Sequence, residues 1–267
     1  MFPAVSNCAS PCNLAHSWFN ARMLDEDLKA KQRTDTRCAS CPVRHRAVCA
    51  RANSEELVLL DSVKFYKTYQ AGQTIALRGD PLEVLSSVVT GTATLSQSME
   101  DGRTQIVGLL LPSDFIGRPG RDTVAHDVTA VTEVTLCCFR RKPFEDLLVN
   151  MPHVQVRLLE MTLDDLDAAR DWMLLLGRKT AREKIASFIL LIANRSVANS
   201  EQTLANQVRL ELPLSRETMA TYLGLTIETV SRQFTALRKD GLIALDGTRT
   251  VFVPDVSALA AEVGDGE

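Results

Sequence analysis

The 267-residue sequence has no long apolar run, no excess of positive charge and few histidines, and each absence excludes a class of protein. Its most apolar stretch, residues 185–193, is much shorter than the roughly 20 residues that cross a bilayer. The first 18 residues lack a basic start followed by a continuous apolar segment, so no secretory signal is predicted. We therefore expect a cytoplasmic protein that does not bind membranes.

The charge balance and the histidine positions limit function further. A net charge of -3 supplies no general basic field, so any binding to DNA must come from local placement of charge. The four histidines, His16, His45, His126 and His153, have no metal-ligand spacing with one another. No paired carboxylates or nucleophile–base set stands out, so an iron–sulfur enzyme is the least favoured hypothesis.

Cysteine is the residue type that the sequence does contain in an informative pattern. Five of the seven cysteines fall in the first 55 residues. In a reducing cytosol, cysteines indicate metal or redox chemistry more than disulfides, and an odd number cannot be fully paired. A segment this short builds little core of its own, so bonds to a metal would order it.

Cys38, Cys41 and Cys49 form the candidate metal site. Thiolate suits zinc, copper(I) and iron–sulfur clusters, and a closed site requires a fourth ligand. One short pair plus a lone cysteine favours a cluster weakly over zinc, whose sites usually contain two pairs. Basic residues would offset the negative charge of four thiolates: Arg44, His45, Arg46 and Arg51. The candidates for the fourth ligand are Cys8, Cys12, Cys137 and Cys138. The alternative interpretation of Cys8, Cys12 and Cys138 is that they are small buried hydrophobic residues.

After the cysteine-rich segment (residues 1–55), residues 56–150 consist of short apolar runs separated by turn signals. This spacing predicts an antiparallel roll or barrel. The expected strands are residues 74–77, 85–89, 93–96, 105–111 and 128–139.

A long helix is predicted from Pro152 to Gly177, because proline suits a first helical turn and glycine a stop. The helix carries two stripes of mainly apolar residues, so one can pack on its own domain and the other on a second subunit. The alternative is one broad core face in a monomer, and we favour the dimer. One stripe is Leu159, Thr162, Leu166, Ala169, Met173 and Leu176; the other is Val154, Leu158, Met161, Asp165, Ala168, Trp172 and Leu175.

The C-terminal part of the chain contains a helix over 178–195, a polar loop over 196–205, a strand over 208–214 and then a helix-turn-helix pattern. Ser215 and Thr226 can cap its two helices, and Gly224 breaks the first. The second helix is predicted to bury Ile227, Val230, Phe234 and Leu237.

The exposed face of the second helix predicts contacts with DNA. Glu228, Ser231 and Arg232 lie together near its N-terminus, where a recognition helix meets base edges. A β-hairpin wing is predicted over residues 243–253. The residues placed for phosphate contacts are Thr229, Arg238, Lys239 and, at the tip of the wing, Arg249. The alternative is an ordinary helix pair with a solvated charged face.

Three motifs occur in order along the chain: Cys-x2-Cys-Pro-x6-Cys at residues 38–49, a roll pattern over residues 70–117, and Glu-Thr-Val-Ser-Arg at residues 228–232. Together they resemble the superfamily of the cAMP receptor protein and the fumarate–nitrate reduction regulator, and most closely its FnrL-type oxygen-responsive branch. The resemblance implies an α+β fold: a cysteine-rich segment, a β-roll like a cyclic-nucleotide-binding domain (56–150), a dimerisation helix (151–178) and a winged helix-turn-helix domain (179–267).

The resemblance also implies a [4Fe–4S] cluster on Cys38, Cys41, Cys49 and Cys137, with Cys138 on the other face of the same strand. It assigns the subunit contact to the stripe that begins at Leu159. It further implies a homodimer that binds a double-stranded operator with TTGAT-type half-sites, works with RNA polymerase and controls anaerobic gene expression as an oxygen-sensing activator.

A cyclic nucleotide is not expected in the roll. Gly117 is followed by Arg118-Pro119, and His126-Asp127 stand near the position where the cAMP-dependent branch has Arg-Ser. A zinc- or thiol-based redox sensor on the same frame is the alternative function.

Overall fold

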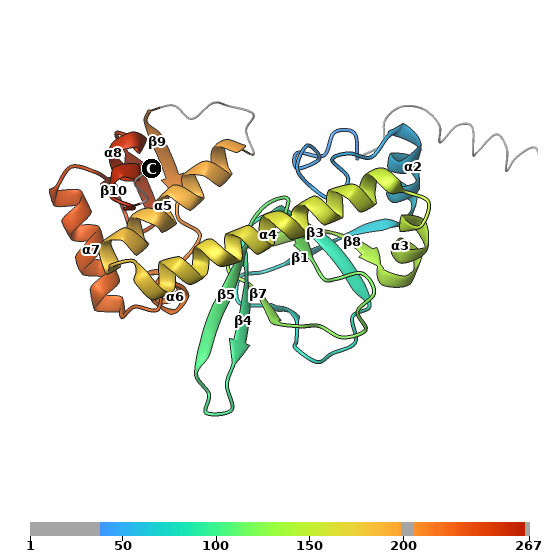
Figure 1. The fold of residues 1–267 in the computed structure, drawn as a ribbon, viewed down its shortest axis with the longest axis horizontal. Coiled ribbons are helices and arrows are strands. Elements are labelled where there is room, and N and C mark those ends of the chain that lie inside the picture. The colour runs from blue at the N-terminus through green and yellow to red at the C-terminus, as the bar shows by residue number, and fades with distance from the viewer. Residues whose placement is uncertain (1–37, 199–205, 265–267) are drawn as a thin grey trace, which may run out of the picture.

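The computed structural model describes residues 38–198 and 206–264, and their elements follow the expected order of roll, long helix and C-terminal domain (Figure 1). No helix in these ranges is both long enough and apolar enough to traverse a bilayer. The elements are α2 (Ser54–Val63), β1 (Lys64–Tyr69), β2 (Thr74–Ala76), β3 (Val84–Thr90), β4 (Ala93–Ser98), β5 (Thr104–Leu110), β6 (Phe115–Ile116), β7 (Asp127–Ala130), β8 (Val134–Arg140), α3 (Arg141–Leu148), α4 (Pro152–Arg178), α5 (Ala181–Ala198), β9 (Val208–Glu211), α6 (Arg216–Leu223), α7 (Ile227–Lys239), β10 (Ala244–Asp246), β11 (Thr250–Val253) and α8 (Val256–Ala261).

The roll consists of two four-stranded antiparallel sheets, in the orders β1-β8-β3-β6 and β2-β7-β4-β5. This confirms the predicted antiparallel roll. In the first sheet β8 is an inner strand, paired with β1 on one side and with β3 on the other. Its side chains alternate between the interior of the roll and the opposite face, which carries the cysteine-rich segment.

The prediction of one strand over residues 128–139 was wrong, because β7 and β8 lie in different sheets and a turn over residues 131–133 separates them. The connection between β3 and β4 holds this turn in place through hydrogen bonds. The Thr92 carbonyl accepts hydrogen bonds from the backbone N–H groups of Val131 (2.8 Å) and Thr132 (3.2 Å). Gly91 comes so close that a Cβ atom there would lie 2.0 Å from the Glu133 carbonyl oxygen, and its φ is +83°. Only glycine fits this position.

Helix α4 connects the two halves of the molecule. Pro152 occupies its first turn, as predicted, and the helix runs past Gly177 to Arg178. Figure 1 shows residues 38–63 beside the first half of α4 and the C-terminal domain at its other end. One hydrophobic cluster joins the cysteine-rich segment, β8, α3 and the inner face of α4, including Val154, Leu158 and Met161. The first turns of α4 are therefore packed directly against the cysteine-rich segment.

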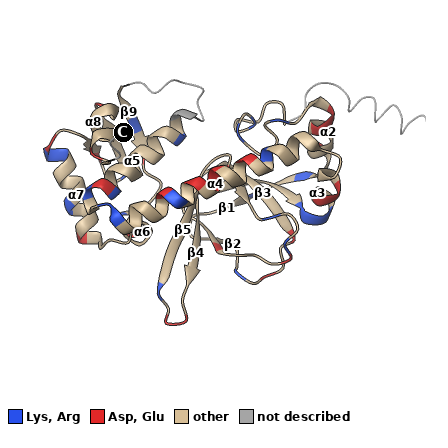
Figure 2. Ribbon diagram, in the orientation of Figure 1, with Lys and Arg blue, Asp and Glu red and all other residues tan. Residues whose placement is uncertain are grey.

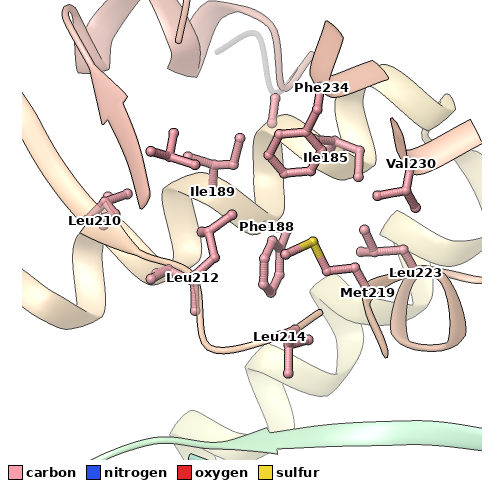
Figure 3. Packing of buried hydrophobic residues seen from close by; sticks show 14 of the residues in the cluster. Ile185, Phe188, Ile189, Leu210, Leu212, Leu214, Met219, Leu223, Val230 and Phe234 are labelled. Carbon is pink, nitrogen blue, oxygen red and sulfur yellow. The ribbon is translucent and has the colours of Figure 1, made fainter. Parts of the chain in front are cut away.

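The C-terminal domain packs α5, α6 and α7 around a core closed by the three-stranded sheet β10-β11-β9. In Figure 3, Phe188 and Ile189 of α5 lie among side chains from α6, α7 and β9. Helix α5 extends to Ala198, so the predicted loop starts later than residue 196, and residues 199–205 lie outside the described ranges. Two roll residues, Ile106 and Leu111, belong to the same core, so the two domains share buried apolar surface.

Candidate metal centre and nucleic-acid interface

The segment from Cys38 to Ala52 folds into successive tight turns. The N–H of Cys41 donates to the Cys38 carbonyl (3.4 Å), and the N–H of Ala52 donates to the Cys49 carbonyl (3.1 Å). Asn53 then caps α2 through a capping box with Glu56. Cys38 is buried at 6% exposure, while Cys41 and Cys49 are half-buried. The turns thus hold three cysteines on a short compact loop.

The two cysteines of β8 lie on opposite faces of the strand. Cys137 packs in the same hydrophobic cluster as Cys38 and Cys49. Cys138 lies in the separate cluster inside the roll at 2% exposure, as expected for a small buried hydrophobic residue. The structure therefore places Cys137 and not Cys138 on the side of the cysteine-rich segment. Cys8 and Cys12, which the sequence also offered as ligands, lie outside the described residues.

The electrostatic surroundings of two candidate thiols, Cys49 and Cys137, include the other cysteines. Burial, together with charge on Cys38 and Cys41, raises the pKa of Cys49 to about 11. Burial also raises the pKa of Cys137, and charge on the other three cysteines acts in the same direction. The thiols of Cys49 and Cys137 are therefore protonated at neutral pH, and any metal that binds them must displace protons. Among the described residues no group of three or more His, Cys, Asp or Glu side chains is arranged to hold a single metal ion.

Within the described residues, Lys64 is a cation that contacts a candidate ligand, and sequence reasoning missed it. Its ammonium donates to the Cys38 sulfur at 3.0 Å and pairs with Asp61. Only 5% of the Lys64 side chain is exposed. Burial opposes its charge, but the hydrogen bonds to Asp61 and Cys38 outweigh burial and raise the pKa of Lys64. A buried positive charge therefore lies beside one of the four sulfurs.

Of the basic residues predicted to offset the thiolate charge, Arg44 does lower the pKa of Cys49, but Arg44 and Arg51 also bond to other groups. The Arg44 guanidinium donates to the Ala52 carbonyl at 3.2 Å and closes the loop on itself. The Arg51 guanidinium pairs with Glu160 of α4 at 2.5 Å. These arginines thus stabilise the loop and its contact with α4.

The helix-turn-helix forms as its sequence predicts. The Ser215 hydroxyl accepts from the Thr218 N–H (3.1 Å), and the Thr226 hydroxyl accepts from the Thr229 N–H (3.2 Å). Gly224 ends α6 in the left-handed region, at φ +63°. Val230, Phe234 and Leu237 of α7 are buried. Ile227 was predicted to share that face, but it is 43% exposed because the first turn of α7 projects beyond the hydrophobic core.

The polar side chains of α7 lie on its open face, and Figure 2 shows acidic and basic positions along this helix. Glu228, Ser231 and Arg232 are exposed, as a recognition helix requires. Hydrogen bonds from its own backbone N–H and from Thr226 lower the pKa of Glu228, so this carboxylate is ionised. The Arg232 guanidinium donates to the Thr229 hydroxyl at 3.2 Å. The remaining predicted DNA contacts, Arg238, Lys239 and Arg249, are exposed.

Arg216 supports the recognition helix, a role that no sequence pattern indicated. Its guanidinium carbon lies 3.2 Å from the centre of the Phe234 ring. Burial lowers the pKa of Arg216 to about 10. The stacked pair ties the start of α6 to the middle of α7, which fixes the angle between the two helices.

The outer stripe of α4 is uncovered in the single chain. Leu159 is 60% exposed, Leu166 46% and Met173 66%. Thr162 and Ala169 are also exposed, while Leu176 packs partly against the C-terminal core. The other stripe packs inward at its two ends, through Val154 and Leu175, as expected for a helix with two seams. An apolar stripe of this length is typical of a protein–protein contact.

The interior of the roll contains a cavity of about 460 Å³. Its lining combines apolar residues of both sheets and Cys138 with Arg118 and Arg121 near the β6–β7 connection. Its volume is that of a small-molecule site. The expectation that no cyclic nucleotide binds there stays a prediction, based on the residues around Gly117 and His126.

Comparison with known protein families gives two matches. Residues 66–150 match the cyclic nucleotide-binding domain family, and residues 183–262 match the Crp-like helix-turn-helix domain family.

Individual relatives extend the similarity over most of the chain. The chain is 62% identical to the transcriptional activator protein FnrL of Cereibacter sphaeroides over 229 residues, which cover 86% of this chain and 92% of that protein. It is 37% identical to the nitrogen fixation regulation protein FixK of Bradyrhizobium diazoefficiens, covering 84% and 94%. Among solved structures, FixK2 from Bradyrhizobium japonicum superposes with a TM-score of 0.69 at 30% identity, covering 77% of this chain and 100% of that one.

Proposed function

Because this chain belongs to the Crp/Fnr family of DNA-binding transcriptional regulators, we propose that it is an oxygen-responsive regulator with a [4Fe–4S] cluster on Cys38, Cys41, Cys49 and Cys137. We further propose that it binds, as a homodimer, a palindromic operator with TTGAT-type half-sites. One observation carries the proposal. The loop with three of the cysteines packs, together with Cys137, on the inner face of α4, and the outer face of that helix is an exposed apolar stripe.

The donor set fits such a group. Four thiols come from two segments, the loop and β8, and three of them, Cys38, Cys49 and Cys137, lie in one hydrophobic cluster. The Lys64 ammonium at the Cys38 sulfur offsets part of the negative charge that four thiolates bring. When bound, the cluster supplies a core of iron and sulfide that oxygen destroys.

The cysteine loop, α4 and α7 would link binding of the cluster to binding of DNA. Ligation from both segments holds the loop against β8 and the inner face of α4. The same helix then presents Leu159, Leu166 and Met173 to a second subunit, and the dimer presents two α7 helices to a two-fold symmetric site. To shift the protein from 1% to 99% in the DNA-binding state, the cluster must favour that state over the other by about 5.5 kcal/mol.

The α7 face supports recognition of specific bases. Arg232 can donate to both guanine acceptors, and ionised Glu228 can accept from a cytosine amine. As a transcriptional activator, the protein would work with RNA polymerase while bound to the operator.

The test is chemical analysis of iron, sulfide and zinc in protein purified without oxygen, with visible spectra and operator binding before and after exposure to air. We expect a brown sample that bleaches in air and loses affinity for the operator. Cys49→Ser should abolish the colour, and Cys8→Ser should leave it unchanged. A colourless sample with stoichiometric zinc would replace the cluster by the zinc- or thiol-based sensor. Equal operator affinity with and without the cluster would refute oxygen control.

A further inference from the structure

A polar contact joins α4 to the cysteine loop beside Cys49. The Arg157 guanidinium reaches across from α4, and its Nη2 donates to the backbone carbonyl of Arg46 at 2.6 Å. The neighbouring Ala47 carbonyl accepts the backbone N–H of Ala50 within the loop, whereas the Arg46 carbonyl accepts from the helix. The Arg157 side chain is only 19% exposed.

Glu160, one turn further along α4, extends this contact. Its carboxylate lies 3.4 Å from Nη1 of Arg157 and 2.5 Å from the Arg51 guanidinium. The two α4 residues therefore hold the loop at Arg46 and at Arg51, on either side of Cys49. A displacement of the loop around Cys49 breaks both contacts.

The two α4 residues that contact the loop lie next to the exposed apolar stripe of the helix. Arg157 and Glu160 flank Leu159, the most N-terminal member of the exposed stripe. A helix is stiff over one turn, so a shift of its inner side at Arg157 is carried to the apolar side chain at Leu159. Arginine suits this position because its planar fork can bond the Arg46 carbonyl and the Glu160 carboxylate at the same time.

We propose that Arg157 is the positioning residue that couples the state of the cysteine loop to the subunit-contact stripe of α4. This inference rests on the proposed function and adds the route by which it is regulated. Arg157 neither binds the cluster nor contacts DNA. It aligns α4 for dimerisation only while the loop is held against the helix.

The experiment compares full-length wild-type protein with Arg157→Met, which keeps the apolar stem and removes the donors. The matched control is Arg170→Met, because Arg170 is an exposed arginine of the same helix that pairs with Asp167 at 2.9 Å. For each protein, iron and sulfide content is measured first. The dimer dissociation constant is then measured by sedimentation, before and after exposure to air.

We expect Arg157→Met to keep the iron and sulfide content of wild type. For each protein, the dimer dissociation constant after air is divided by the value before air. This ratio should be smaller in Arg157→Met than in wild type by about tenfold or more, because the variant loses one charge-assisted hydrogen bond. Arg157→Lys should recover part of the ratio, and it carries the test if Arg157→Met does not fold. Arg170→Met should behave as wild type.

Two results would overturn the coupling role. In one, Arg157→Met keeps the wild-type ratio. In the other it loses the iron and sulfide, which would make Arg157 a residue that holds the cluster site together. Wild-type protein without a cluster would instead contradict the proposed function itself, and the coupling role with it.

Discussion

Leu159→Ala tests the subunit contact at the position where the outer stripe of α4 is widely exposed. The substitution removes three carbon atoms, each contributing about 0.8 kcal/mol when fully buried. Because Leu159 is 60% exposed in the single chain, about that fraction of the gain is still available on dimerisation. The loss is therefore about 1.4 kcal/mol per subunit. Two-fold symmetry doubles it to about 3 kcal/mol, or roughly a hundredfold in the dimer dissociation constant.

The assay is sedimentation equilibrium of cluster-loaded protein over a range of concentrations, with the thermal unfolding of the monomer measured alongside. The monomer should unfold at nearly the wild-type temperature, because the removed atoms are largely solvated there. Leu174→Ala is the matched control: Leu174 is 52% exposed on the same helix but lies outside the stripe. An unchanged dissociation constant for Leu159→Ala, or equal changes in both variants, would refute the assignment of this stripe to the interface.

Three further predictions concern DNA readout and the cysteine site. Arg232→Ala should cost about 1–3 kcal/mol and relax specificity at one base pair, which competition between base-substituted operators measures; equal weakening on all sequences would make this residue a phosphate contact. Lys64→Met removes the ammonium beside the Cys38 sulfur, so it should lower the reduction potential of the cluster and speed its bleaching in air. Lys67→Met, which changes an exposed residue of the same strand, should do neither. Cys137→Ser should abolish the visible absorption and Cys138→Ser should keep it, and the reverse pattern would show that β8 presents its other face.

Local signals made much of the fold predictable. The start of α4 follows from Pro152, and the helix-turn-helix follows from the hydroxyl caps Ser215 and Thr226 and from Gly224, all of which act within one or two turns. Alternation along β8 predicted that Cys137 and Cys138 face opposite sides, whereas the choice of Cys137 as the ligand came from the family resemblance.

Features that depend on distant segments could not be predicted. Strand β1 (Lys64–Tyr69) is mostly exposed and has no apolar alternation, so its pairing with β8 is what forms it. The buried charge of Lys64 arises only when Asp61 and Cys38 meet in space. The turn between β7 and β8 has no glycine or proline of its own, because Gly91 and Thr92 from another connection shape it.

Because the roll and the C-terminal domain share buried surface, the C-terminal domain cannot be fused to an unrelated sensor domain without further changes. Ile106 and Leu111 belong to the C-terminal core, and the Gln105 amide donates to the Thr221 carbonyl at 3.0 Å. A DNA-binding fragment that begins at the end of α4 would expose the apolar surface that Ile106 and Leu111 cover. It would also leave the Thr221 carbonyl without its hydrogen bond from Gln105. A chimera that grafts α5 to α8 onto a foreign sensor must therefore transplant the matching edge of β5 as well.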